Sequence, residues 1–185
     1  MNAIYTAYDR ITATLDRAAV WITPTLARFV FAATLLVYFW KSGMTKLGDG
    51  ILGFVQPSSG GYVQIFPRAM EAAGYDTAQL GLFHWAVVTA GIWAEFILPA
   101  LIVVGLLTRI AALGMIGFIA VQSLTDLFGH GGIAQAQTLG AWFDRLPDGV
   151  ILDQRAFWVL ALVVLLVHGA GPLSLDRVLR HSRAA

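Results

Sequence analysis

One carboxylate, Glu95, interrupts the middle of a long apolar stretch of the chain. Between Leu82 and Val104, the other clearly polar side chains are those of His84 and Thr89. A helix of this length can cross the hydrocarbon layer of a membrane, which takes about 20 apolar residues. A carboxylate at that depth is costly unless it is paired, protonated or in contact with water. Glu95 therefore marks a candidate site, and another part of the chain must supply its partner.

Arg28 is the partner that the sequence predicts for Glu95. It lies about 9–10 Å inside another apolar stretch, counted at 1.5 Å per residue. Glu95 lies roughly 13 Å from the same side by the same count, because its helix runs in the opposite direction. Such a pair has two interpretations. It is either a structural ion pair that joins two helices, or a protonatable group in a quinone or proton site.

A second polar group is expected at the other end of these helices. Gln122, Asp126 and His130 follow one another at i, i+4 spacing and share one helical face. His84 opens the neighbouring span, so two imidazoles and a carboxylate are available to hold Zn or Cu. The alternative is a hydrated vestibule without a metal. The expected outer polar vestibule consists of Tyr38, Lys41, His84, Gln122, Asp126 and His130.

Other cofactor sites are not expected. Two axial histidines for a haem would have to lie at similar depth, but His168 is at the opposite end of the spans from His84 and His130. The sequence has no catalytic Ser/His/Asp arrangement, nucleotide-binding loop or dinucleotide fingerprint.

The composition indicates an integral membrane protein. Of 185 residues, 58% are hydrophobic and 12% are charged, whereas globular proteins carry roughly 25% charged residues. A net charge of +1 gives no basic surface for a nucleic acid, so no nucleic-acid partner is expected. The chain contains no cysteine. Disulfides, thiolate metal ligands and dithiol electron relays are therefore excluded for this chain.

The apolar spans predict an all-α membrane protein, a four-transmembrane-helix bundle with amphipathic surface helices, forming one domain over residues 1–185. Residues 3–19 carry apolar side chains on one face, which predicts a helix along the membrane surface or one that binds a partner. In the long connection after the first span, Asp76 and Gln79 resemble a capping box at the start of the second span. The expected spans are residues 22–44, 82–107, 110–128 and 155–171.

Four spans place both termini on one side of the membrane and both long connections on the other. The terminal segments and the short turn at Arg109 contain six arginines, whereas the long connections contain fewer Lys and Arg residues. Since Lys and Arg favour the cytoplasmic side, both termini are expected to be cytoplasmic.

Four short motifs lie in order along these spans. They are Ala27-Arg28-Phe29 leading to Lys41-Ser42-Gly43 and Lys46-Leu47; Ala94-Glu95; Gly105-Leu106-Leu107-Thr108-Arg109; and Gly171-Pro172-Leu173-Ser174-Leu175-Asp176. Their order and spacing resemble the DoxX family of small bacterial membrane proteins, and the Gly-Leu-Leu-Thr-Arg hairpin is the most specific of them. The resemblance implies a multi-pass, four-helix bundle in the bacterial inner membrane. The family takes its name from a subunit of quinone-linked oxidoreductases, including thiosulfate:quinone oxidoreductase. Other members resemble accessory or assembly proteins of redox and metal-stress operons.

Three functional hypotheses follow from the residues and the resemblance. The first is a membrane subunit that docks a quinone or a redox partner, with Arg28 and Glu95 at the site and quinone as the cofactor. The second is a non-catalytic assembly or stress-response scaffold whose polar interior is structural. The third is an outward-facing metal site formed by His84, Asp126 and His130. An accessory subunit is expected rather than a complete enzyme. The expected partners are the lipid bilayer and proteins of a membrane redox or stress system, and a homo-oligomer is an open alternative.

Overall fold

A computed structural model of the chain describes the backbone of residues 2–184 and the side chains of residues 3–182. The fold is helical, and no β-strand occurs within this range. Four helical segments are long and apolar enough to cross a membrane, which confirms the predicted all-α membrane bundle. Those segments are Ala3–Met44, Leu82–Val104, Thr108–Gly129 and Val150–His168.

Three of the four spans combine α-helix with one π-helical turn. Such turns are uncommon and often lie at functional sites. The first span consists of α1, η1 and α2, the third of α6 and η4, and the fourth of η6 and α8, whereas the second is α5 alone. Their bounds are α1 Asn2–Phe31, η1 Ala32–Leu36, α2 Val37–Met44, α5 Leu82–Val104, α6 Thr108–Leu124, η4 Thr125–Gly129, η6 Val150–Gln154 and α8 Arg155–His168.

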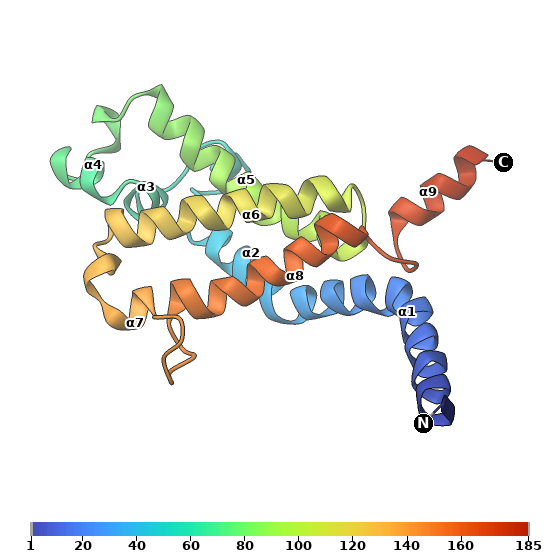
Figure 1. Cartoon of the computed structure of the whole chain (residues 1–185). Helices are drawn as coiled ribbons and strands as arrows, with labels where there is room; N and C mark the ends of the chain where they lie inside the picture. The colour runs from blue at the N-terminus through green and yellow to red at the C-terminus, as the bar shows by residue number, and fades with distance from the viewer. Residues whose placement is uncertain (1, 185) are drawn as a thin grey trace.

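The predicted N-terminal surface helix and the first span form one continuous helix. Figure 1 shows the first half of α1, in dark blue, turning away from the bundle. Pro24 lies inside this helix, where its ring and its missing N–H weaken the helical hydrogen bonding and favour a bend. The apolar side chains of the first half, including Ile4, Tyr8 and Leu15, are exposed. They are therefore available to the membrane surface.

A tight hairpin joins α5 to α6. Gly105 ends α5 in the left-handed conformation, at φ +70°, and a Cβ at this position would lie 2.6 Å from Cβ of Ser174. Thr108 begins α6 only three residues later. The antiparallel packing of α5 and α6 that this hairpin enforces brings Gly114 against the side chain of Leu98. The hairpin expected from the sequence is thus present.

The bundle has two distinct ends (Figure 1). One end, called the terminal end, carries the first half of α1, the hairpin and the C-terminal helix α9, Leu175–Ala184. The other, called the loop end, carries the two long connections. The connection between the third and fourth spans, residues 130–149, contains the short helices η5 Gly132–Ala134 and α7 Ala136–Leu139.

The connection between the first two spans folds back onto α5. Its side chains Tyr62 and Met70 are buried against Val88 and Ile92 of α5, which gives a second apolar core beside that of the bundle. The second span begins at Leu82, as in the expected range 82–107, but the capping box at Asp76 does not start it, because the Asp76 carboxylate caps the separate short helix η3. The helices of this connection are η2 Ile51–Phe54, α3 Ser59–Ile65, α4 Pro67–Ala72 and η3 Thr77–Gln79.

Candidate functional site

The buried carboxylate of Glu95 pairs with Lys46. The Lys46 Nζ atom lies 2.9 Å from Oε1 and 3.0 Å from Oε2 of Glu95. The two side chains are 7% and 1% exposed. The predicted pairing of Glu95 with Arg28 is therefore wrong.

Arg28 is instead bound to backbone carbonyl groups at the terminal end. Its Nε donates to the oxygen of Ile102 at 3.0 Å, and its Nη1 donates to that of Ala170 at 2.9 Å. Further hydrogen bonds reach the carbonyl oxygens of Val103 and Leu173. Ile102 lies seven residues, about 10 Å, further along α5 than Glu95. The long arginine side chain thus reaches the unpaired carbonyls at the helix end rather than the carboxylate.

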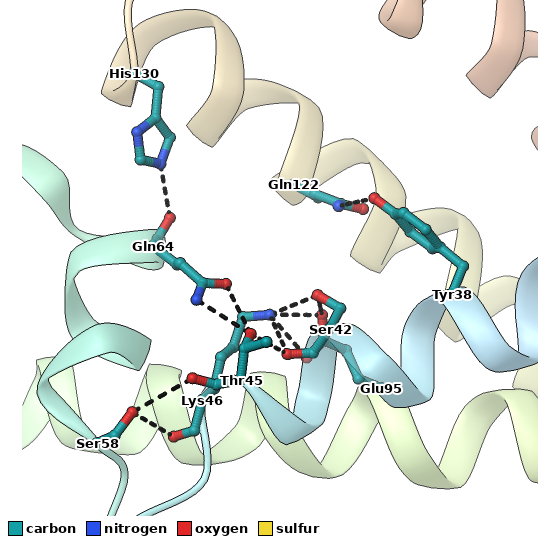
Figure 2. Close-up of polar contacts among 9 residues, drawn as sticks. All are labelled: Tyr38, Ser42, Thr45, Lys46, Ser58, Gln64, Glu95, Gln122 and His130. Atoms are coloured by element: carbon teal, nitrogen blue, oxygen red, sulfur yellow. Dashed lines mark hydrogen bonds and ion pairs between the residues drawn. The ribbon is translucent and has the colours of Figure 1, made fainter.

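Ser42 completes the buried pair. Ser42 and Lys46 are four residues apart at the end of α2, so they lie on one face of the chain. The Ser42 hydroxyl donates to Glu95 Oε1 at 2.8 Å and accepts from Lys46 Nζ at 2.7 Å. Lys46 Nζ also donates to the Ser42 carbonyl at 3.1 Å, which satisfies one of the free carbonyls at this helix end. Figure 2 shows these three side chains converging from α2 and α5.

The close approach of α2 to α5 depends on Gly43. A Cβ at this position would lie 2.8 Å from the ring of Phe96, the residue after Glu95. The backbone beyond α2 is held by the first connection, since the Lys46 carbonyl accepts from the backbone N–H of Ser58 at 3.0 Å. Gln64 of α3 hydrogen-bonds Thr45 through their side chains. The folded connection thus fixes Lys46 where it can reach Glu95.

A cavity of about 420 Å³ lies beside the ion pair. Its volume falls within the range of about 300–1,000 Å³ that is usual for small-molecule sites. Ser42, Lys46 and Glu95 contribute polar groups from one side, and Gln122, Asp126 and His130 contribute them from the α6 side. Most of the remaining wall is apolar or backbone: Ile65, Val87, Ala90, Gly91, Ala94, Gly114, Gly117, Phe118 and Val121. The Glu95 site and part of the predicted vestibule are therefore one cavity.

Four residues of the predicted vestibule lie at this cavity or beside it: Gln122, Asp126 and His130 line it, and Tyr38 contacts Gln122. The Tyr38 hydroxyl accepts from Gln122 Nε2 at 3.2 Å, while Gln122 Oε1 is buried without a hydrogen-bond partner in the described structure. His130 Nε2 lies 2.9 Å from the carbonyl oxygen of Gln64, which joins η4 to α3 (Figure 2). Lys41 is exposed and His84 packs edge-on against Phe66, and neither lines the cavity.

The predicted metal site is not formed. Among the described residues, no group of three His, Cys, Asp or Glu side chains is close enough to hold a metal ion. Asp126 is ion-paired with Arg155 of α8, and Ser123 accepts a hydrogen bond from the same guanidinium at 2.8 Å. Because Arg155 is 4% exposed, Asp126 serves to neutralise a buried cation. His84 lies apart, beside the first connection.

A second charged group closes the terminal end. The Asp176 carboxylate accepts from the backbone N–H groups of Leu107 at 2.8 Å and Thr108 at 3.0 Å, and so caps the start of α6. Burial raises the pKa of Asp176, but the hydrogen bonds from Thr108 and Leu107 and the charge of Arg180 outweigh it and hold the pKa below its usual value. Arg28 and Asp176 thus hold the spans together at the terminal end, opposite the loop end.

The sequence motifs therefore separate into two groups in space. Arg28, the hairpin and Asp176 make the terminal clasp, whereas Ser42, Lys46 and Glu95 make the buried pair beside the cavity. Neither Ser42 nor Lys46 was predicted from the sequence as a site residue. A usable signal was present, because Tyr38, Ser42 and Lys46 follow one another at four-residue spacing and so lie along one side of the first span.

The fold and the site define a multi-pass α-helical membrane protein with a buried ion pair beside a cavity. The sequence model of the DoxX family matches residues 23–131, more than half of the chain, and the protein belongs to this family. The match contains Arg28, Ser42, Lys46 and Glu95 and ends before α8 and Asp176. Comparisons with curated proteins and with solved structures gave no match.

Proposed function

We propose that this DoxX-family protein is a membrane subunit that binds a quinone headgroup in the cavity beside Lys46 and Glu95 and docks a redox partner. The observation that supports this proposal is the combination of a buried, hydrogen-bonded ion pair with a cavity whose walls are mostly apolar. A quinone is a planar, largely apolar ring with carbonyl oxygens that accept hydrogen bonds. The donors of Lys46 and Ser42 are engaged within the ion pair, whereas the Gln122 amide on the other side of the cavity keeps one N–H group besides the one that it donates to Tyr38.

The position of the cavity also suits a lipid-soluble ligand. Gly114 and Gly117 line it, both belong to the third candidate span, and both are exposed on the surface of the bundle. The absence of side chains at these glycines leaves the cavity wall thin on the side that faces the lipid. An isoprenoid tail can leave the cavity there while the headgroup stays inside.

Proton exchange is the second requirement of quinone chemistry. Conversion of a quinone to a quinol takes up two electrons and two protons. Glu95 and His130 line the cavity and carry groups that can exchange protons, whereas Asp126 is engaged by Arg155. The proposal assigns the electrons to a partner protein. It places the protein in the bacterial inner membrane with both termini cytoplasmic.

A second candidate function is a non-catalytic assembly or stress-response scaffold. The observation that favours it is the saturation of the ion pair within the protein. Both oxygens of Glu95 accept from Lys46, and one also accepts from Ser42. A pair satisfied in this way can join α2 to α5 without any ligand.

A substitution that fills the cavity distinguishes the quinone-binding subunit from the non-catalytic scaffold. A Cβ at Gly117 would meet no atom within 4 Å, so Gly117→Leu adds a side chain without an immediate clash of its first carbon. Ala120→Leu is the matched control, because Ala120 is an exposed residue of α6 that does not line the cavity. Binding of a short-chain ubiquinone analogue to the purified proteins is measured at equilibrium in detergent.

The quinone proposal expects the wild type and Ala120→Leu to bind alike. Gly117→Leu is expected to bind at least about tenfold more weakly, which corresponds to about 1.4 kcal/mol. If the wild type does not bind the analogue, or if Gly117→Leu binds it as the wild type does, the quinone proposal fails. Retained stability and partner association in Gly117→Leu would then favour the scaffold.

A further inference from the structure

A second cavity, of about 360 Å³, lies at the terminal end and is separate from the cavity of the proposed function. It is formed where the bend of α1, the end of α8 and the start of α9 meet. Trp21 contributes the α1 side, and the segment from His168 to Pro172 contributes its backbone. Gly171 permits this packing, because a Cβ there would lie 3.0 Å from the Pro24 ring and its φ is +76°.

The side chains of this cavity carry an excess of positive charge. Arg177 and Arg180 line it, together with His168 and His181. The acidic residue of the lining is Asp176, whose carboxylate is occupied by the backbone N–H groups of the hairpin. Two permanent cations therefore face one carboxylate that already has hydrogen-bond donors.

The two arginines have unused hydrogen-bond donors. The Arg177 guanidinium carbon lies 4.5 Å from the centre of the Trp21 ring, which fixes the plane of the group by stacking. Neither the Arg177 nor the Arg180 side chain has a hydrogen-bond partner within the described part of the chain. A guanidinium that is held by an aromatic ring and retains its N–H groups is suited to an oxyanion such as phosphate.

The location of the cavity identifies the source of that anion. His168 is the last residue of the fourth candidate span, so the cavity lies at the level where a span leaves the hydrocarbon. Tryptophan is frequent at that level, next to lipid headgroups. Val20 and Trp21 give the cavity an apolar side beside its basic side chains. Basic pockets between helix ends are typical binding sites for anionic lipid headgroups.

We propose that this cavity binds the phosphate group of an anionic phospholipid headgroup, with Arg177 and Arg180 as its ligands and Trp21 as the support of Arg177. The lipid holds the start of α9 against the bend of α1. The same phosphate chemistry could come from free phosphate in solution. The apolar side of the cavity and its position at the end of two spans favour the lipid.

The test compares lipid binding by the full-length protein and by two charge-matched double variants. Native mass spectrometry from a zwitterionic detergent measures the affinity for phosphatidylglycerol, for phosphatidylcholine and for inorganic phosphate. Arg177→Gln/Arg180→Gln removes two cations from the cavity. Arg10→Gln/Arg17→Gln removes two cations from the first half of α1, where neither residue lines the cavity.

The wild type is expected to bind phosphatidylglycerol more tightly than phosphatidylcholine. The cavity variant should lose at least about tenfold in affinity for phosphatidylglycerol, and the control variant less than about twofold. Equal losses in both variants would show general surface attraction and overturn the proposal. Displacement of the lipid by millimolar inorganic phosphate would assign the site to a soluble anion instead.

A single substitution provides a second test in case the double variant does not fold. Arg180 is exposed, so Arg180→Gln alone should leave the fold intact. This variant is expected to lose several-fold in affinity for phosphatidylglycerol, and unchanged affinity would contradict the proposal. The occluding Gly117→Leu substitution lies in the other cavity and should leave this lipid affinity unchanged. Failure of the quinone proposal and failure of the lipid proposal are thus separate results.

Discussion

The buried pair of Lys46 and Glu95 gives the sharpest prediction about the interior of this protein. The Nζ atom of Lys46 contacts both oxygens of Glu95 and both oxygens of Ser42, and the side chains of the pair are 7% and 1% exposed. Removal of one partner from such a pair leaves an uncompensated buried charge. The cost of that loss is about 3–5 kcal/mol, whereas replacing both partners by uncharged groups often costs far less.

Three variants measure this coupling. Lys46→Met and Glu95→Gln should each lower the free energy of unfolding in mixed micelles by up to about 3–5 kcal/mol. The Lys46→Met/Glu95→Gln double variant should be more stable than the sum of the two losses predicts. The expected interaction energy is about 2–3 kcal/mol, at the upper end for residues in direct contact.

Arg28 supplies the control for the same cycle. Arg28→Met removes hydrogen bonds to carbonyls at the ends of α5 and α8, and it should also destabilise the protein. Its effect should add to that of Glu95→Gln, because the two side chains are not in contact. Additive behaviour of Lys46 and Glu95, or strong coupling of Arg28 and Glu95, would refute the pairing described here.

Two further predictions concern the terminal end and the orientation of the bundle. Asp176→Ala should destabilise the protein at neutral pH by about 1 kcal/mol, as for a lost helix cap. Since the pKa of Asp176 is below its usual value, its contribution is present above about pH 4 and is lost as the pH falls through its folded-state pKa. Unfolding curves of both proteins should therefore converge in acid, and a constant difference would contradict the cap. For orientation, single cysteines at Ser58 and Ala134 should react with an impermeant maleimide in whole cells, and one at Ser182 should not; the opposite labelling would reverse the topology.

Hydropathy was sufficient to predict the bundle but not the partner of its buried carboxylate. Apolar stretches of sufficient length predict spans regardless of how they pack, and the hairpin between α5 and α6 was evident from Gly105 to Arg109. The Arg28 prediction failed because it compared depths along straight helices. It gave no weight to the carbonyl groups that a helix end offers to an arginine side chain.

Lys46 was missed because it lies two residues after the end of α2 and was assigned to a connection. The side chain of Lys46 points into the bundle because the folded connection holds its backbone, through the hydrogen bond from Ser58 N–H to the Lys46 carbonyl. The π-helical turn η1 adds a further difficulty. A π-helical turn holds more residues than an α-helical turn, so the residues after it face a different direction from that of a continuous α-helix. Neither feature has a strong sequence signal.

For the outer polar residues too, the sequence predicted a shared helical face but not the partners of its side chains. Gln122, Asp126 and His130 do follow one side of the third span, as their spacing predicted. Their partners come from elsewhere in the chain: Tyr38, Arg155 and the Gln64 carbonyl, respectively. Spacing within one helix identifies a polar face, but long-range contacts decide whether that face holds a metal, an ion pair or a ligand.

The central claim is that a quinone headgroup occupies the cavity beside Lys46 and Glu95. Photolabelling with an azido-quinone, followed by peptide mass spectrometry, tests it most directly. We expect the label to attach to segments that line the cavity, within Val87–Glu95 of α5 and Gly114–Gln122 of α6, and Gly117→Leu to abolish this labelling. Labelling confined to segments that do not line the cavity, or labelling of the cavity segments that persists in Gly117→Leu, would contradict quinone binding at this site.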